Sequence, residues 1–478
     1  MKYLFGFCLL TFGFSLSAQD SIALKYSKFI RSADIKEFIT VLASDSLEGR
    51  ETAQPGQKKA ARYIAKQFNS FGIQPHKNTY FQPFYLTTVK PEKTSINING
   101  KQLEFLKDYF HISNFSNDSI SSDKVIFIGK SYGDIKNKVV VALLKDRSEK
   151  EVKELMNSEA KAVFFIDDKA DLKMSSAAYH WRAEKLKVLE TNPKKTTPVF
   201  FISPKSAKKA FKSKIRKKDF SNKELECKTV IKINIESERV SSENVIGYVE
   251  GGDLKNELVV ITAHYDHLGK HDGKIYYGAD DDGSGTAAVI ALSKAFQQAK
   301  KEGHGSRRSI LFMTVSGEEK GLLGSSFYAS NPLFPLENTV ADLNIDMIGR
   351  IDEKHGTNPD YVYLIGSDKL SSELHKISDS ANTTYTKLEL DYTFNAPEDP
   401  NRFYYRSDHY NFAKNGIPVI FYFNGVHADY HQPSDTVDKI NFDKVEKISK
   451  LVFFTAWELA NRNKKIVVDT ESDFKNTR

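Results

Sequence analysis

Two histidines and four carboxylates in the second half of the chain stand just past apolar runs, and each can bind a metal ion or move a proton. They are His264, one aspartate of the run Asp280-Asp281-Asp282, Glu318, Glu319, Asp346 and His431. Imidazole nitrogen and carboxylate oxygen are ligands of zinc, and a catalytic zinc keeps one position open for water. Five ligands can hold two ions while the sixth group handles a proton. The set therefore predicts a metal-dependent hydrolase.

The run of three aspartates leaves open which carboxylate would bind both ions. With the following Gly-Ser-Gly they resemble the start of a calcium-binding loop. Such a loop needs a bidentate glutamate at its twelfth position, which is Ala291 here, so calcium is disfavoured. The flanking glycines permit a tight backbone from which one carboxylate can point inward and bridge two ions. We expect that carboxylate to be Asp281, with Asp280 and Asp282 as alternatives.

Glu318 and Glu319 follow an apolar run and a glycine. Adjacent residues at a strand end point in different directions, so one can bind metal while the other accepts a proton from water. Asp266, two residues after His264, is placed to accept the second imidazole N–H and orient the ring.

Several aromatic and basic residues near the last histidine are weaker candidates. Tyr430 can donate a hydrogen bond to a developing oxyanion, although an ordinary core or surface aromatic is the alternative. His409 is a less favoured candidate for any role in the site. A nearby loop contains four further candidates, Arg402, Tyr404, Tyr405 and Arg406. These side chains could also donate hydrogen bonds to an oxyanion, and the two arginines could instead bind a substrate carboxylate.

Strands and helices alternate from Asn244 onward, and the chemistry-bearing residues stand where the strands end. Near-continuous apolar runs are typical of strands buried on both faces, and a helical stretch at 285–301 separates the first two. The runs are 258–263, 309–315, 341–345 and 417–423. This alternation predicts an α/β three-layer sandwich with a mostly parallel central sheet. Sites in such sheets form outside the carboxyl ends of the strands, where these residues fall.

The remaining sequence predicts a second domain inserted into the first. A short helix is expected at 35–42, and Pro55-Gly56 opens a second one that Gly72 ends. Short β-rich runs and one helical stretch at 149–158 then indicate a small domain with its own core. The expected bounds are 1–18 for a signal peptide, 19–87 and 241–465 for the catalytic domain, 88–240 for the insert and 466–478 for a tail.

The first 18 residues have the features of a secretory signal peptide: Lys2, a short apolar core and small residues before Gln19. We therefore expect an exported protein, periplasmic or secreted. Cleavage would leave Cys227 as the one cysteine, so no internal disulfide is expected. No other segment reaches the roughly 20 apolar residues that span a bilayer, and stable membrane insertion is not expected.

The net charge of +7 lies in one segment, since 203–219 contains eight Lys or Arg and one Asp. A surface that binds nucleic acid or a membrane is one interpretation of this segment. The spacing of its apolar residues instead favours an amphipathic helix whose basic face is solvated, so no nucleic-acid partner is expected. A serine hydrolase is not supported, because no Gly-x-Ser-x-Gly follows a strand. Nucleotide use is not supported either, because no phosphate loop occurs.

Taken in order, these motifs resemble the co-catalytic (dizinc) aminopeptidase and glutamate carboxypeptidase family of zinc metallopeptidases. The resemblance covers about 244–461 and extends to the stretch 42–50 and the helix after it, while the insert looks like a protease-associated domain. It implies two Zn²⁺ per chain, bridged by Asp281. His264 and Asp346 would complete the coordination of one ion, and Glu319 and His431 that of the other. Glu318 would be the general base and Tyr430 an oxyanion donor.

The favoured hypothesis is a secreted zinc exopeptidase, an aminopeptidase that releases N-terminal amino acids from peptides or proteins through a dizinc-bound hydroxide. A carboxypeptidase of the glutamate carboxypeptidase type is one alternative. A glutaminyl-cyclase-like acyltransferase, which would need a single zinc, is another. A non-catalytic binding protein is least favoured, because no ligand is missing from the pattern.

Overall fold

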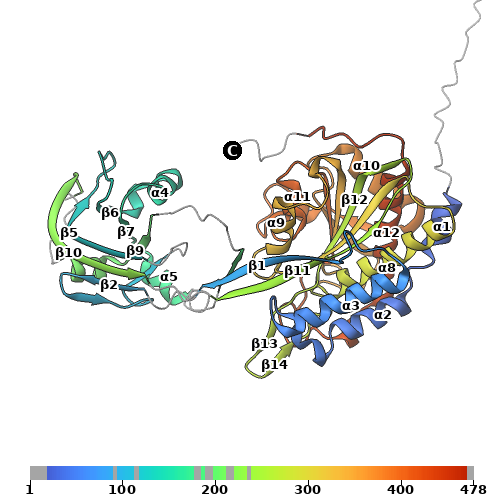
Figure 1. Ribbon diagram of the computed structural model, residues 1–478, viewed down its shortest axis with the longest axis horizontal. Coiled ribbons are helices and arrows are strands. Elements are labelled where there is room, and N and C mark those ends of the chain that lie inside the picture. The colour runs from blue at the N-terminus through green and yellow to red at the C-terminus, as the bar shows by residue number, and fades with distance from the viewer. Residues whose placement is uncertain are drawn as a thin grey trace, which may run out of the picture. The chain divides into compact units, whose positions relative to one another are not determined.

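The computed structural model describes residues 19–89, 94–111, 118–176, 185–188, 197–211, 220–233 and 238–470. The chain divides into two compact units, one made of Met1–Phe84 with Ser241–Arg478 and the other of Tyr85–Val240 (Figure 1). The expected signal peptide lies outside the described residues, as do 212–219 of the basic run and 471–478 of the tail.

The larger unit is built on a mixed sheet whose centre is parallel. Its strands run in the order β18-β17-β19-β16-β12-β15-β11-β1. The four central strands β19, β16, β12 and β15 are parallel to one another, whereas β17 and β11 run antiparallel to β19 and β15. The strands are β1 (Phe81–Val89), β11 (Arg239–Val249), β12 (Leu254–His264), β15 (Arg308–Val315), β16 (Thr339–Ile345), β17 (Tyr361–Ile365), β18 (Glu389–Asp391) and β19 (Val419–Phe423).

Helices cover both faces of this sheet, as Figure 1 shows, so the predicted α/β sandwich is confirmed. One face packs on α8 (Gly283–Lys301) and α12 (Phe442–Asn461). Four further helices pack against these two: α1 (Ser21–Ser27), α2 (Ser32–Leu42), α3 (Pro55–Phe71) and α10 (Ser372–Ala381). The other face packs on α9 (Leu323–Ser330) and α11 (His409–Ala413). Short elements join these: β13 (Gly269–His271), β14 (Lys274–Tyr276), η1 (Asp45–Arg50) and η8 (Phe403–Tyr405).

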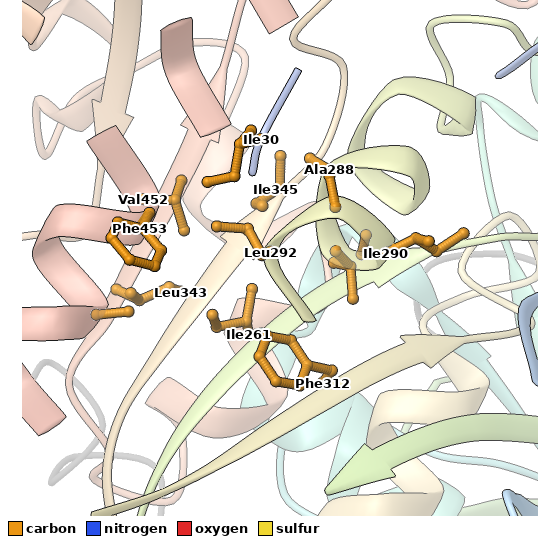
Figure 2. Close-up of a cluster of buried hydrophobic side chains, with 14 of the residues drawn as sticks. Ile30, Ile261, Ala288, Ile290, Leu292, Phe312, Leu343, Ile345, Val452 and Phe453 are labelled. Carbon is orange, nitrogen blue, oxygen red and sulfur yellow. The ribbon is translucent and has the colours of Figure 1, made fainter. Parts of the chain in front are cut away.

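Alternating residues of β12 form two separate cores, because successive side chains of a strand point to opposite faces. Ile261 and its same-face neighbours pack with Leu292 of α8 and Phe453 of α12 (Figure 2). Val260 joins the second core with Phe412 of α11. Burial on both faces explains why the strand sequences are apolar throughout rather than alternating.

Local signals set the helix bounds. Pro55 occupies the first turn of α3, where its missing N–H has no partner to lose, and Gly72 ends the helix in the left-handed conformation with φ +79°. The predicted helices at 35–42 and 55–71 are confirmed. The predicted strand at 417–423 begins only at Val419, after a proline that cannot donate to the ladder.

The smaller unit has its own eight-stranded sheet in the order β3-β2-β10-β5-β6-β7-β9-β4 and two cores of its own. Its strands are β2 (Ser95–Ile98), β3 (Lys101–Leu103), β4 (Tyr109–His111), β5 (Asp118–Phe127), β6 (Val139–Leu143), β7 (Ala162–Ile166), β9 (Val199–Ile202) and β10 (Lys223–Ile233). Its helices are α4 (Glu149–Met156), α5 (Ala170–Ser176) and α7 (Pro204–Ala210), and β8 (Lys185–Val188) pairs with β1.

Candidate metal centre

The predicted ligands come from five segments that meet at the carboxyl edge of the larger sheet. His264 is the last residue of β12, and Asp346 follows β16, its parallel neighbour. Glu319 follows β15, on the other side of β12. Asp281 lies in the loop before α8, and His431 lies in the loop after β19. Parallel strands end at one edge, which is why ligands far apart in sequence converge here.

Two groups of three side chains share Asp281. The Nε2 atom of His264 lies 3.2 Å from Asp281 Oδ1 and 3.5 Å from Asp346 Oδ1. The Nε2 atom of His431 lies 3.2 Å from Asp281 Oδ2 and 3.3 Å from Glu319 Oε2. Each oxygen of Asp281 therefore faces one group, as a carboxylate that bridges two ions must.

These distances fit tetrahedral zinc. Zinc bonds to nitrogen and oxygen are about 2.0–2.1 Å long, so the ligand atoms at the corners of a tetrahedron lie about 3.3 Å apart. All four measured separations lie close to that value. In addition, Asp281 Oδ2 is buried and accepts no hydrogen bond from the described residues. The donor set and its geometry both suit two zinc ions.

The electrostatics of the cluster favour bound cations. Burial lowers the pKa of His264, but the charges of Asp346 and Glu318 outweigh it and raise that pKa well above the usual range. Burial likewise opposes protonation of His431, yet Asp281 and Glu319 raise its pKa to about 10. A site that draws protons onto its histidines so strongly also attracts metal cations.

The structure distinguishes the three adjacent aspartates. Asp282 caps α8: its Oδ1 accepts hydrogen bonds from the backbone N–H of Gly285 at 2.8 Å and of Met347 at 3.1 Å. Asp280 Oδ1 accepts from the N–H of Gly349 at 2.6 Å. Both flanking carboxylates accept backbone hydrogen bonds, and the second oxygen of Asp280 lies 3.2 Å from His427 Nε2. Asp281 is the aspartate of the three that lies 3.2 Å from both His264 and His431.

Glu318 stands beside the two groups without belonging to either. Burial, together with the charges of Glu319 and Asp346, raises the pKa of Glu318 well above its usual range despite the nearby His264. A carboxylate with a raised pKa is a stronger proton acceptor. The adjacent glutamates therefore face different surroundings, as expected for two residues at a strand end.

Asp266 differs from its expected contact. The Nδ1 atom of His264 lies 3.1 Å from the backbone oxygen of Asp266 but 3.9 Å from its carboxylate. The prediction that the carboxylate accepts the imidazole N–H is wrong. Instead that carboxylate accepts hydrogen bonds from the Thr52 hydroxyl at 2.6 Å and from the Glu318 N–H at 3.3 Å. The chain turns directly after β12, which brings the carbonyl rather than the side chain to the ring.

A small pocket of about 30 Å³ opens beside the centre. Glu318, Tyr430 and Arg406 line it together with four of the predicted ligands, His264, Asp281, Asp346 and His431. Tyr430 stacks on His431 with ring centroids 3.9 Å apart. One wall of the pocket is non-polar and consists of Met347, Phe403, Phe421, Phe423 and Val426. The surface next to the predicted ligands is therefore non-polar on one side of the pocket.

The other weak candidates lie away from the metal ligands. His409 is fully buried with its ring 4.8 Å from that of Phe421, and burial lowers its pKa to about 3, as befits a core residue. Tyr404 is buried in the same core. Arg402 lies over the ring of Tyr405 at 4.9 Å.

Three residues that sequence reasoning missed form hydrogen bonds with the predicted ligands or with the segments around them. His267 Nδ1 lies 2.8 Å from Glu319 Oε1. The Ser407 hydroxyl donates to Asp346 Oδ2 at 2.6 Å. Arg50 is fully buried, and its guanidinium donates to the carbonyls of Tyr265, Leu42, Tyr277 and Gly278. For His267, the signal in the sequence was its place next to the His-x-Asp unit.

Comparisons with known proteins match the second half of the chain to a family of peptidases. Residues 244–456 match the family described as Peptidase family M28. A probable leucine aminopeptidase of Arthroderma otae is 34% identical over 43% of this chain and 55% of its own length. Aminopeptidase YwaD of Bacillus subtilis is 26% identical over 47% of this chain and 46% of its own. The chain thus spans about half the length of the curated relatives it matches.

The fold has a solved counterpart. The structure of an aminopeptidase from Aneurinibacillus sp. strain AM-1 superposes with a TM-score of 0.57 and 19% identity, covering 94% of this chain and 98% of that one. At that identity the match shows a shared fold.

Proposed function

We propose that this chain, whose residues 244–456 belong to peptidase family M28, is a zinc-dependent aminopeptidase that releases N-terminal residues from peptides. The observation that carries the proposal is the pair of three-ligand groups that share Asp281, each with the spacing of tetrahedral zinc. His264 and Asp346 would hold one ion and Glu319 and His431 the other.

The residues around the centre suit peptide hydrolysis. Bound zinc would supply a Lewis acid that polarises the scissile carbonyl and acidifies the attacking water. Glu318, which lines the pocket, would accept the proton of that water and pass it to the leaving amine. Tyr430, which lines the same pocket, donates a hydrogen bond to the developing oxyanion.

The non-polar wall of the pocket supports a preference for substrates with a large apolar side chain at the N-terminus. Three phenylalanines, Met347 and Val426 form this wall directly beside the ligands. Burying such a side chain there contributes about 1.5–3 kcal/mol. The two fungal and bacterial relatives are named aminopeptidases, one of them for leucine, which agrees with this preference.

The test is a substrate panel assayed with purified protein whose zinc content has been measured. Leucyl peptides with a free amine should be cleaved, N-acetylated ones should not, and a chelator should stop the reaction. Cleavage of blocked and free peptides at equal rates would contradict the aminopeptidase assignment. No cleavage of any peptide by a protein loaded with zinc would contradict the whole proposal.

A carboxypeptidase is the second candidate, and Arg406 is the observation that favours it. Its guanidinium lines the pocket, over the ring of Phe403 at 4.9 Å, and guanidinium groups bind carboxylates in a bidentate manner. Peptides amidated at the C-terminus separate the two activities, because a carboxypeptidase requires the free carboxylate. Zinc stoichiometry separates both from a cyclase, since that enzyme class would need one ion.

We also propose that the protein is exported after removal of residues 1–18. The apolar stretch near the N-terminus, which follows Lys2 and ends in small residues, supports this. Separately, none of the helices in the described part of the chain is long and apolar enough to cross a membrane. Mass spectrometry of protein collected outside the cytoplasm should give a chain that begins at Gln19. An uncleaved N-terminus in exported material would contradict this proposal.

A further inference from the structure

His267 lies at the metal centre although neither the sequence pattern nor the implied ligand set includes it. Its side chain is 0% exposed, and its Nδ1 lies 2.8 Å from Glu319 Oε1 and 3.8 Å from Asp281 Oδ2. Its Nε2 is buried without a hydrogen-bond partner among the described residues. Nδ1 therefore makes the ring's hydrogen bond, and it makes it to a predicted zinc ligand.

The ring is fixed in place by segments far apart in sequence. The backbone N–H of His267 donates to the carbonyl of Arg50 at 3.2 Å. The Arg50 guanidinium in turn donates to the carbonyl of Gly278 at 2.9 Å. Gly278 lies flat against the imidazole, since a Cβ there would stand 2.5 Å from the ring carbon Cγ. The ring cannot turn away from Glu319 without moving the loop that carries Asp281.

His267, Asp281 and Glu319 lie close enough together to hold an ion, so the individual distances decide whether His267 is a metal ligand or a hydrogen-bond donor. Two ligands of one tetrahedral zinc stand about 3.3 Å apart. His431 meets this spacing with Glu319 Oε2 at 3.3 Å. His267 Nδ1 is too close to Glu319 Oε1, at 2.8 Å, and too far from Asp281 Oδ2, at 3.8 Å. A separation of 2.8 Å is instead that of a charge-assisted N–H···O⁻ hydrogen bond.

Glu319 thus divides its two oxygens between two histidines. Oε1 accepts from His267, and Oε2 faces His431 and the position between the ligands. A carboxylate can only accept, so Nδ1 of His267 carries the proton.

We propose that His267 is a positioning residue that holds Glu319 by Oε1 and leaves Oε2 to bind zinc. The inference rests on the proposed metal centre and adds a residue to it. Groups that orient a metal ligand from behind typically affect metal affinity about 10- to 100-fold. The effect should fall on the ion held by Glu319 and His431, and the ion held by His264 and Asp346 should be retained.

Three substitutions test the donor role. His267→Asn puts an amide N–H near the position of Nδ1, His267→Gln puts it near Nε2, and His267→Ala removes it. The exposed His271 gives a matched control, His271→Ala. Zinc is titrated into metal-free protein against a chromophoric chelator to give two stepwise affinities. Thermal unfolding of each metal-free variant is measured alongside.

The expected result is a second zinc affinity about 10- to 100-fold weaker in His267→Ala and His267→Gln, and close to wild type in His267→Asn and His271→Ala. If His267→Ala does not fold, the Asn and Gln variants decide. Equal second affinities in all variants would overturn the positioning role. A loss in His267→Asn as large as in His267→Gln would overturn it too. Failure of the wild type to bind two ions would instead count against the proposed function.

Discussion

The metal centre has two halves that share Asp281 and are built differently. In the first half, His264 and Asp346 stand at the ends of two paired parallel strands, and the His264 side chain is 1% exposed. In the second half, His431 comes from a loop after β19 and is 36% exposed, with a left-handed backbone at φ +57°. Ordering a loop costs conformational entropy that a strand end does not. We therefore expect the first half to hold its ion more tightly and the second half to exchange it.

The largest effect should come from Asp281→Asn, because it removes what the halves share. An amide cannot donate a negative charge to both ions, and the chemistry that two metals supply is worth several kcal/mol. We expect hydrolysis to fall by about 10³-fold or more and both zinc affinities to weaken. Metal content measured by mass spectrometry checks this. Loss of one ion alone would show that the halves do not share Asp281.

Glu318→Gln should remove activity while leaving both halves intact. A general base contributes about 10²- to 10⁴-fold to the rate, and Glu318 contacts neither ion in the proposed arrangement. The expected result is a kcat lower by that factor with an unchanged content of two zinc ions. An unchanged kcat would contradict the assignment of Glu318 as the base, and loss of zinc would move Glu318 into the ligand set.

The halves are compared directly by His264→Ala and His431→Ala. Because His431 is partly exposed and on a loop, its loss should release the second ion and leave the first bound. Loss of His264 should weaken the ion of the buried half. Stepwise zinc affinities from a competition titration distinguish the two variants. If His431→Ala kept the ion of the second half and lost the ion of the first half, the expected order of the two zinc affinities would be wrong.

The smallest effect should come from Ser407, the counterpart of His267 in the first half. Its hydroxyl donates to Asp346 Oδ2 and accepts a hydrogen bond from the Asn344 amide at 2.9 Å. Ser407→Ala should weaken the first zinc affinity by about tenfold, and Ser407→Thr, which keeps the hydroxyl, should stay near wild type. Equal affinities in the Ala variant and wild type would show that strand pairing alone orients Asp346.

Much of this arrangement follows from local patterns. The apolar runs before His264, Glu318 and Asp346 are long enough to mark buried strands, and polar residues that follow such strands gather at one edge of a parallel sheet. Helix α3 could be bounded by Pro55 and Gly72, since proline and glycine act on the backbone of their own turn.

Other contacts depend on segments that no local pattern relates. The correct acceptor for His264 Nδ1 is a backbone carbonyl two residues on, and the carboxylate expected there turns to Thr52, more than two hundred residues earlier. His267 looks like one more polar residue after a strand, and its partner Glu319 is 52 positions away. Sequence spacing carries no information on which way such side chains point.

The sequence by itself determined the kinds of ligand, the strands that present them and the α/β class, because these depend on residue type and on periodicity within one segment. The tertiary structure decided which of the three adjacent aspartates faces the histidines of both ligand groups. It assigned Asp282 to the cap of α8 and Asp280 to the backbone of Gly349, and left Asp281 between two histidines. Neighbouring side chains of equal chemistry differ only in what the folded chain brings to each of them.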